Sequence, residues 1–211
     1  MSKLATNNQV TIAGEVVSKF LFSHEVFGEG FYTTEIRVRR ESGIDDVIPV
    51  MISERLIDVT QDYSGQYMAI LGQFRSYNMQ KSPKNKLKLL VFATEVEIVE
   101  EMFEMTNAIY LEGYLCKKPI YRVTPFGREI TDLLLAVNRP YSKSDYIPCI
   151  VWGRNARYME KLQVGEKLKI EGRIQSREYT KVLADGTAEV RVVYEVSVNK
   201  FTKEETDEQC S

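Results

Sequence analysis

Aromatic and cationic side chains are interleaved between Asn138 and Arg154, in a pattern that suits binding of single-stranded nucleic acid. The stretch reads NRPYSKSDYIPCIVWGR and contains three rings, Tyr141, Tyr146 and Trp152, and three cations, Arg139, Lys143 and Arg154. A base presents a π-face whatever its identity, and its phosphates are anionic, so rings beside cations hold a strand without reading its sequence. Tyr146 and Trp152 are six residues apart, so both rings leave the same face of an extended strand.

Trp152 has a competing interpretation as a core residue, because a lone tryptophan in a strand is more often buried than exposed. The charges that flank it, together with a family resemblance carried by other blocks of the sequence, favour an open ring instead. Other tyrosines, Tyr110, Tyr114, Tyr121 and Tyr194, have no such flanking pattern and are expected to pack in the barrel or at its rim.

Length and composition indicate an ordinary globular chain without a membrane segment. The 211 residues allow one large domain or two small ones, with 44% hydrophobic and 27% charged residues. The apolar runs are too short to cross a bilayer, and the N-terminal residues lack the apolar centre of a signal peptide. Three widely spaced cysteines predict no disulfide framework and favour a reducing cytoplasm.

Charge is distributed unevenly along the chain, although the net value is only −2. Residues 1–104 contain 11 Lys and Arg against 15 Asp and Glu, whereas residues 105–211 contain 17 against 15. Four of the latter acids lie in the last eight residues. The positive field is therefore expected in the half that contains the aromatic stretch.

The chain contains an internal repeat. A shift of 99 residues superimposes Gly14 on Gly113, Arg40 on Arg139, Pro49 on Pro148 and Arg55 on Arg154, and a shift of 100 superimposes Gly72 on Gly172. Two copies of one module, joined by residues 100–106, explain this pattern economically.

Within each copy the hydrophobic pattern is mainly that of strands. In the second copy, alternation predicts strands over 109–115, 129–137, 145–152, 167–179 and 189–200, with a helix over 155–162. The first copy repeats this order, with Leu56 and Val59 on its helix. Five strands with a helix between the third and fourth is the order of an OB-fold. We therefore predict an all-β chain of tandem five-stranded OB-fold barrels, with one short helix per repeat.

Several sequence blocks of the second copy carry a family resemblance. They are NxxYLEG from residue 107, TPFG from 124, LAVNRP from 135, DYIPCIVWGR from 145 and EGRIQSREY from 171. With these blocks in order, residues 107–200 resemble the bacterial single-stranded DNA-binding protein family. The resemblance implies an OB barrel that binds single-stranded DNA.

The resemblance also implies a set of nucleic-acid-binding residues. Its stacking positions correspond to Tyr141, Tyr146, Trp152 and Tyr179, and the expected phosphate neighbours are Arg139, Arg154, Arg173 and Arg177, with Lys143. The first copy has Ser42, Val47 and Ser53 at three of the matching positions, so only Tyr77, beside Arg75, remains as a stacking candidate there. Further cations of that copy, such as Lys81, Lys84 and Lys88, could follow phosphates.

Three segments follow from these observations. Residues 1–104 are expected to form a partly degenerate N-terminal OB-fold, and residues 105–203 a C-terminal OB-fold that binds single-stranded DNA. Residues 204–211 are expected to be a short acidic disordered tail. The tail lacks the family's terminal Pro-Phe, so its recruitment of replication or repair proteins is left open.

The predicted function is sequence-tolerant binding of single-stranded DNA in replication, recombination or repair. By analogy with the family's four barrels, two-barrel chains are expected to form a homodimer in the cytoplasm, at the nucleoid. The single histidine offers no catalytic pair and no metal cluster, so no enzyme activity, cofactor or metal is expected. The alternative is an OB-fold used for protein docking or RNA binding, with weak or lost binding of single-stranded DNA.

Overall fold

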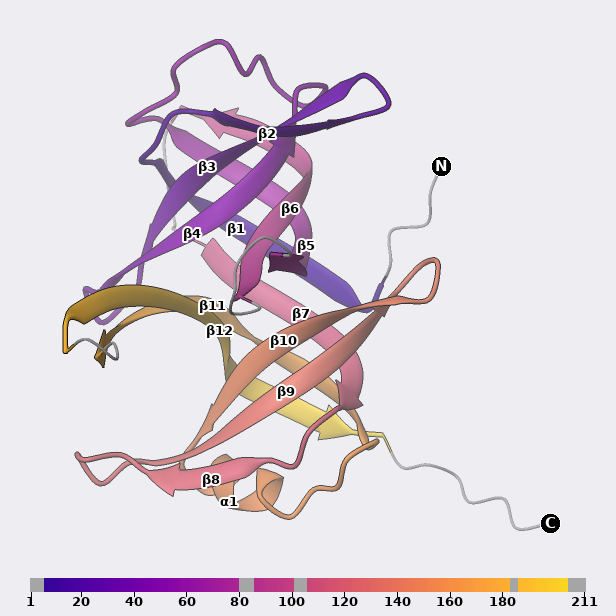
Figure 1. Ribbon diagram of the computed structural model, residues 1–211, viewed down its shortest axis with the longest axis vertical. Coiled ribbons are helices and arrows are strands. Elements are labelled where there is room, and N and C mark those ends of the chain that lie inside the picture. Colours follow the sequence, from indigo (N-terminus) through magenta and orange to yellow (C-terminus); the bar gives the residue numbers. More distant parts are fainter. Residues whose placement is uncertain (1–5, 80–85, 101–105, 183–185, 205–211) are drawn as a thin grey trace. The chain divides into compact units, whose positions relative to one another are not determined.

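The computed structural model describes residues 6–79, 86–100, 106–182 and 186–204 (Figure 1). Within these residues the chain forms twelve strands and one helix. They are β1 (Asn8–Val16), β2 (Leu21–Val26), β3 (Glu29–Arg39), β4 (Asp45–Ser53), β5 (Tyr67–Met79), β6 (Lys86–Val99), β7 (Thr106–Leu115), β8 (Ile120–Val123), β9 (Glu129–Arg139), β10 (Lys143–Trp152), α1 (Arg154–Met159), β11 (Lys167–Val182) and β12 (Ala188–Lys203). The cations Lys81 and Lys84, most of the linker and the acidic tail after Glu204 lie outside the described residues.

The described residues divide into two units, which are treated separately below. The first unit, called the N-barrel, contains residues 9–108 together with 174–195. The second, called the C-barrel, contains residues 109–173 together with 196–204 and 6–8. Strands β1, β7, β11 and β12 therefore contribute residues to both units.

Each unit contains a closed ring of five strands. In the N-barrel, β1 pairs with both β3 and β5, β3 pairs with β4, and β5 pairs with β6, all antiparallel. A short parallel pairing of β4 with β6 closes the ring. The C-barrel repeats this connectivity with β7, β9, β10, β12 and β11, and its parallel pair is β10 with β12. This closure is that of the OB-fold, so the predicted fold class is confirmed.

Alternation of side chains along the strands places one face of each strand in a core. Ile36, Ile48 and Phe74 are fully buried in the N-barrel, as are Leu111 and Leu135 in the C-barrel. Their neighbours along the strand face outward. Two further strands, β2 and β8, were not expected from the sequence. Within the part of the chain that the structure describes, each pairs only with the strand that follows it, β3 or β9.

The helix content differs from the prediction. In the second repeat, α1 covers Arg154–Met159, near the predicted span of 155–162, and buries Ala156 and Met159. In the first repeat, the expected helix with Leu56 and Val59 is absent, and the segment forms turns. The prediction of one short helix per repeat is therefore wrong for the first repeat.

Local hydrogen bonds explain these turns. The Asp58 carboxylate accepts bonds from the amide and hydroxyl of Thr60, at 3.0 and 2.7 Å. Asp62 accepts the same two bonds from Ser64, at 3.0 and 2.6 Å. Such side-chain bonds compete with helical backbone bonds. The bonds to Asp62, led by the one from the Ser64 hydroxyl, lower its pKa to about 2.

Glycines at matching positions of the two repeats mark close approaches between strands. A Cβ on Gly14 would collide with the carbonyl oxygen of Arg37, and one on Gly113 would collide with that of Ala136. A second matched pair, Gly72 and Gly172, is equally constrained. These glycines are therefore required by space where adjacent strands approach each other.

Replacement of Gly113 by alanine is expected to lower the free energy of unfolding by about 1–3 kcal/mol, the usual cost of overpacking. In an ordinary strand interior the same change is stabilising by roughly 0.5–1 kcal/mol. Urea denaturation of the variant measures the sign directly. A neutral or stabilising result would contradict the proposed collision with Ala136.

Candidate nucleic-acid interface

Strand β10 presents two aromatic rings on the outer face of the C-barrel. Tyr146 is 43% exposed and Trp152 is 38% exposed, while Ile147, Cys149 and Val151 on the opposite face are buried. The even-numbered positions of β10 thus face outward. Ile150, an even-numbered position between the two rings, is the exception, because its side chain is buried.

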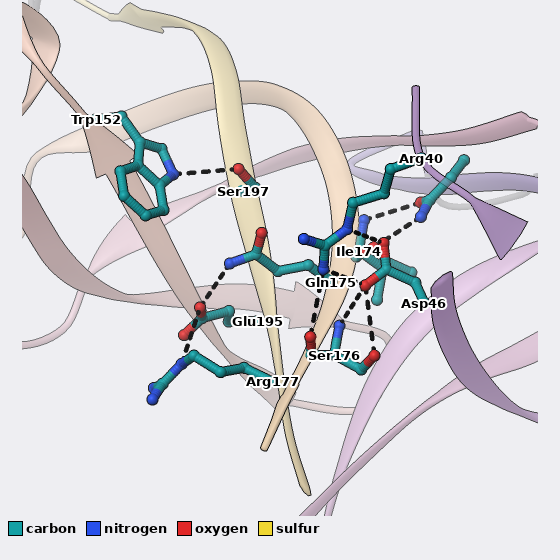
Figure 2. Close-up of polar contacts among 10 residues, drawn as sticks. Arg40, Asp46, Trp152, Ile174, Gln175, Ser176, Arg177, Glu195 and Ser197 are labelled. Atoms are coloured by element: carbon teal, nitrogen blue, oxygen red, sulfur yellow. Dashed lines mark hydrogen bonds and ion pairs between the residues drawn. The ribbon is translucent and has the colours of Figure 1, made fainter. Parts of the chain in front are cut away.

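The Trp152 indole is held at the surface by one polar contact. Its Nε1 donates to the hydroxyl of Ser197, at 3.3 Å (Figure 2). Ser197 is near because β12 runs parallel to β10 and pairs with it at Ile150. A hydrogen bond at the ring edge leaves the π-face available for stacking.

A hollow of about 580 Å³ lies beside Trp152 in the C-barrel, between the β8–β9 hairpin and the start of α1. Its lining includes Arg128, Glu129 and Arg157. The Arg157 guanidinium and the Tyr121 hydroxyl each donate to Glu129, both at 2.6 Å. These bonds, that of Arg157 first, lower the pKa of Glu129. The negative charge of Glu129 in the lining of the hollow is thus compensated by Arg157.

Arg128 is a candidate site residue that the sequence reasoning missed. It is exposed, and no ion pair involves it among the residues that the structure describes. Its place directly after the Phe126-Gly127 turn was a usable signal, because the turn carries it to the edge of the hollow. Arg128 is therefore an exposed cation at the edge of the hollow that Trp152 also lines.

Tyr114 was expected to pack, but it is an exposed residue on the same outer face. It lies opposite Ala136 in the β7–β9 pair, and Ala136 lies opposite Tyr146 in the β9–β10 pair. Residues opposite each other share a face of the sheet. The small Ala136 therefore separates two outward-facing tyrosines.

Three predicted residues lie at the ends of β10. Tyr141 is 94% exposed in the turn before the strand, where its φ is 61°. Lys143 is exposed at the first position of β10. Arg154 is exposed at the first position of α1, directly after Gly153. All three side chains are therefore accessible to a ligand that lies along β10.

Arg139 and Arg173 are less accessible. The Arg139 guanidinium donates to the carboxylate of Asp145 at 3.3 Å, and the two side chains are only 24% and 1% exposed. The matched residue of the first repeat, Arg40, makes the same kind of pair with Asp46. Arg139 therefore compensates a buried carboxylate, and Arg173 is half-buried.

Alanine in place of Arg139 is expected to destabilise the fold, because Asp145 would lose its cation in a buried place. We expect a loss of about 2 kcal/mol in the free energy of unfolding, measured by urea denaturation. Arg154→Ala, at an exposed position, is the control and should leave stability unchanged. Equal stability of the two variants would show that the Arg139–Asp145 pair contributes little.

The remaining predicted residues belong to the N-barrel. Arg177 is exposed and its Nε lies 3.7 Å from Glu195, which also accepts a bond from Gln175 at 2.7 Å (Figure 2). Half-buried side chains in this unit are Tyr179, Arg75 and Tyr77. The predicted residues thus form two sets, one on each unit.

Two negative observations apply to the described ranges of the chain. No helix there is long and apolar enough to cross a membrane. No group of three or more His, Cys, Asp or Glu side chains is gathered there in a way that could hold a metal ion.

Comparison with known proteins gives matches of two kinds. Residues 106–203 match the Single-strand binding protein family. A single-stranded DNA-binding protein of Halalkalibacterium halodurans is 38% identical over 82 residues, which are 36% of this chain and 49% of the relative. One of Clostridium tetani is 41% identical over 91 residues, which are 38% of this chain and 59% of the relative. The chain spans about half the length of these curated relatives.

Among solved structures, the wild-type single-stranded DNA binding protein from Thermus aquaticus matches with a TM-score of 0.77. The match covers 97% of this chain and 96% of that chain, at 19% sequence identity. A deletion mutant of the same protein matches with a TM-score of 0.74 at 21% identity. At such identities the likeness establishes a common fold.

Proposed function

Because residues 106–203 match the Single-strand binding protein family, we propose that the chain binds single-stranded DNA with little preference for base sequence. The observation that carries this proposal is the pair of open rings, Tyr146 and Trp152, on one face of β10. The family and the curated relatives are named for binding single strands, so we propose a binding function without enzymatic activity.

In the proposed mechanism, bases stack on rings and phosphates meet nearby cations. Stacking contributes about 1–3 kcal/mol per base and does not depend on base identity. Tyr146 and Trp152 supply rings on β10, and Tyr141 supplies one in the turn before it. Exposed cations are supplied by Lys143, Arg154 and Arg128. Arg139 and Arg173 contribute less directly, because their side chains are less accessible.

Emission of Trp152 provides the direct test, because it is the only tryptophan of the chain. Titration with oligo-dT is expected to quench this emission at low salt. Binding should weaken when salt is raised, because displaced counterions return to the DNA. A fourfold rise in salt should cost a factor of about ten for every two or three phosphate contacts. Absence of quenching at low salt would reject the proposal. Competition by oligo-U with equal affinity would assign the site to single strands of either polymer.

The cellular role is the finer part of this proposal. Binding of exposed single strands would serve replication, recombination or repair in the cytoplasm, at the nucleoid. Replication or repair proteins are then the expected protein partners.

Assembly is proposed to be homodimeric, so that two chains supply four barrels. Light scattering measures the mass of the particle in solution. A mass of twice 24.3 kDa is expected, and a strict monomer would reject the dimer.

A further inference from the structure

The outer face of the N-barrel carries a row of rings that ends in a guanidinium. The His24 and Phe31 rings are stacked, with centroids 5.2 Å apart and an interplanar angle of 13°. Phe31 is followed by Phe92, with centroids 5.8 Å apart. The Arg75 guanidinium carbon lies 3.8 Å from the centroid of Phe92. We call these four residues the aromatic row.

Strand register explains why the aromatic row lies on the outer face. Phe31 on β3 is directly opposite Ser53 on β4, and Phe92 on β6 is paired with Met51 on β4 and Gln73 on β5. The residues that alternate with these positions, such as Val50, Phe74 and Val91, form the core. The rings are half-buried at Phe31 and Phe92, and His24 is exposed. The row is therefore open at its His24 end.

Arg75 gives the row a positive charge that no carboxylate neutralises among the described residues. Its guanidinium donates to the side-chain oxygen of Gln73, at 3.2 and 2.9 Å. An amide oxygen orients a guanidinium without cancelling its charge. On the same face, Tyr77 pairs across the strands with the exposed Lys88. This end of the row thus combines rings and cations.

Carboxylates lie near the other end of the row and have partners of their own. Glu54 accepts a bond from the amide of Gly30 at 2.9 Å, and Glu29 forms an ion pair with Arg55 at 3.1 Å. Phosphates would avoid this end. A strand is therefore expected to place its bases on the rings and its backbone toward Arg75 and Lys88.

The repeat shows how this arrangement relates to the C-barrel. Ser53 is the residue that matches Trp152 after the shift of 99, and it carries no ring. In the C-barrel, Trp152 lies opposite Ile130, whereas in the N-barrel Ser53 lies opposite Phe31. At this cross-strand pair, the C-barrel thus carries its ring on β10, whereas the N-barrel carries its ring on β3, the partner of β4.

We propose that the aromatic row is a second base-stacking site for single-stranded nucleic acid, located on the N-barrel. This proposal rests on the proposed function and extends it to positions that the second repeat does not use for rings. Interleaved rings and guanidinium groups are what a sequence-tolerant site requires. A base stacks at the open His24 end, and Arg75 receives a phosphate.

The test measures binding of fluorescently labelled oligo-dT to the full chain by anisotropy. A background variant with Trp152→Leu and Tyr146→Leu reduces stacking on the C-barrel and leaves binding that the N-barrel supplies. Adding Phe31→Leu and Phe92→Leu keeps apolar bulk but removes the ring beneath His24 and the ring beneath Arg75. The residual binding is expected to weaken at least fivefold. A loss of residual binding of less than about fivefold would overturn the inference.

Controls separate this inference from folding and from the proposed function. Phe20→Leu makes the same change at a half-buried ring that packs edge-on against Tyr63, and it should leave binding unchanged. Arg75→Gln should reduce the slope of log K against log salt by about 0.7, as expected for one lost phosphate contact. An unchanged slope would overturn the role of Arg75. If the unmodified chain fails to bind oligo-dT, the proposed function itself fails. If it binds and the aromatic-row variants do not change the affinity, this inference alone fails.

Discussion

Alanine in place of Trp152 is expected to weaken binding of oligo-dT by roughly 5- to 150-fold. The indole is the largest exposed ring on β10, and its Nε1 is already oriented by Ser197. Loss of one base–aromatic stack costs about 1–3 kcal/mol, which corresponds to that range. Anisotropy of a labelled oligonucleotide measures the change, because the variant has no tryptophan emission.

Two variants make this result interpretable. Trp152→Phe retains a ring and should recover most of the affinity. Tyr158→Ala removes another exposed ring of the C-barrel, one that stacks on Phe201 with centroids 5.4 Å apart, and should leave binding unchanged. A loss from Tyr158→Ala as large as that from Trp152→Ala would mean that β10 is not the binding face.

Alanine in place of Asp46 is expected to lower the free energy of unfolding by about 3–5 kcal/mol. This fully buried carboxylate accepts bonds from Arg40 Nε at 2.7 Å and from the amide of Ser176 at 2.7 Å (Figure 2). Removing it leaves a largely buried guanidinium and a backbone amide without their acceptor. A buried charge without its partner is among the most costly defects in a protein.

The neighbouring residue offers a matched control for this prediction. Asp45 forms an ion pair with Arg39 at 2.9 Å, but both side chains are accessible to solvent. Exposed pairs contribute little, so Asp45→Ala should unfold at nearly the same urea concentration as the unmodified chain. Similar midpoints for Asp46→Ala and Asp45→Ala would refute the structural importance of the buried pair.

Sequence patterns were sufficient for the barrels because strand alternation and repeat spacing are local properties. The outward rings of β10 follow from the period of two, and the matched glycines follow from the shift between copies. The short strands β2 and β8 were not predicted, because the prediction relied on alternation between buried and exposed positions. Every residue of β2 is exposed, so its sequence has no alternation to detect.

Features that depend on contacts across strands could not be predicted in this way. The engagement of Arg139 by Asp145 depends on the register of β9 against β10, and a list of cations does not contain that information. The aromatic row was missed because each repeat position was compared with its counterpart along the chain. Phe31 occupies the space next to Ser53 from a different strand.

Helix prediction in the first repeat was wrong because the spacing of Leu56 and Val59 was considered without the side chains between them. Asp58 and Asp62 bond to residues two positions onward and stabilise turns. Apolar spacing alone therefore overestimates helix where such acids are present.

The N-barrel is formed by two separate segments of the chain, and this affects how the protein can be divided into fragments. A recombinant piece that ends at residue 104 would omit Asn107, which bonds through its side chain to both backbone groups of Ile174, at 2.7 and 2.9 Å. It would also omit residues 174–195, which belong to that unit. Cutting the chain between the repeats would thus remove from the N-barrel residues that belong to the second repeat. Co-expression of both halves should supply the missing residues.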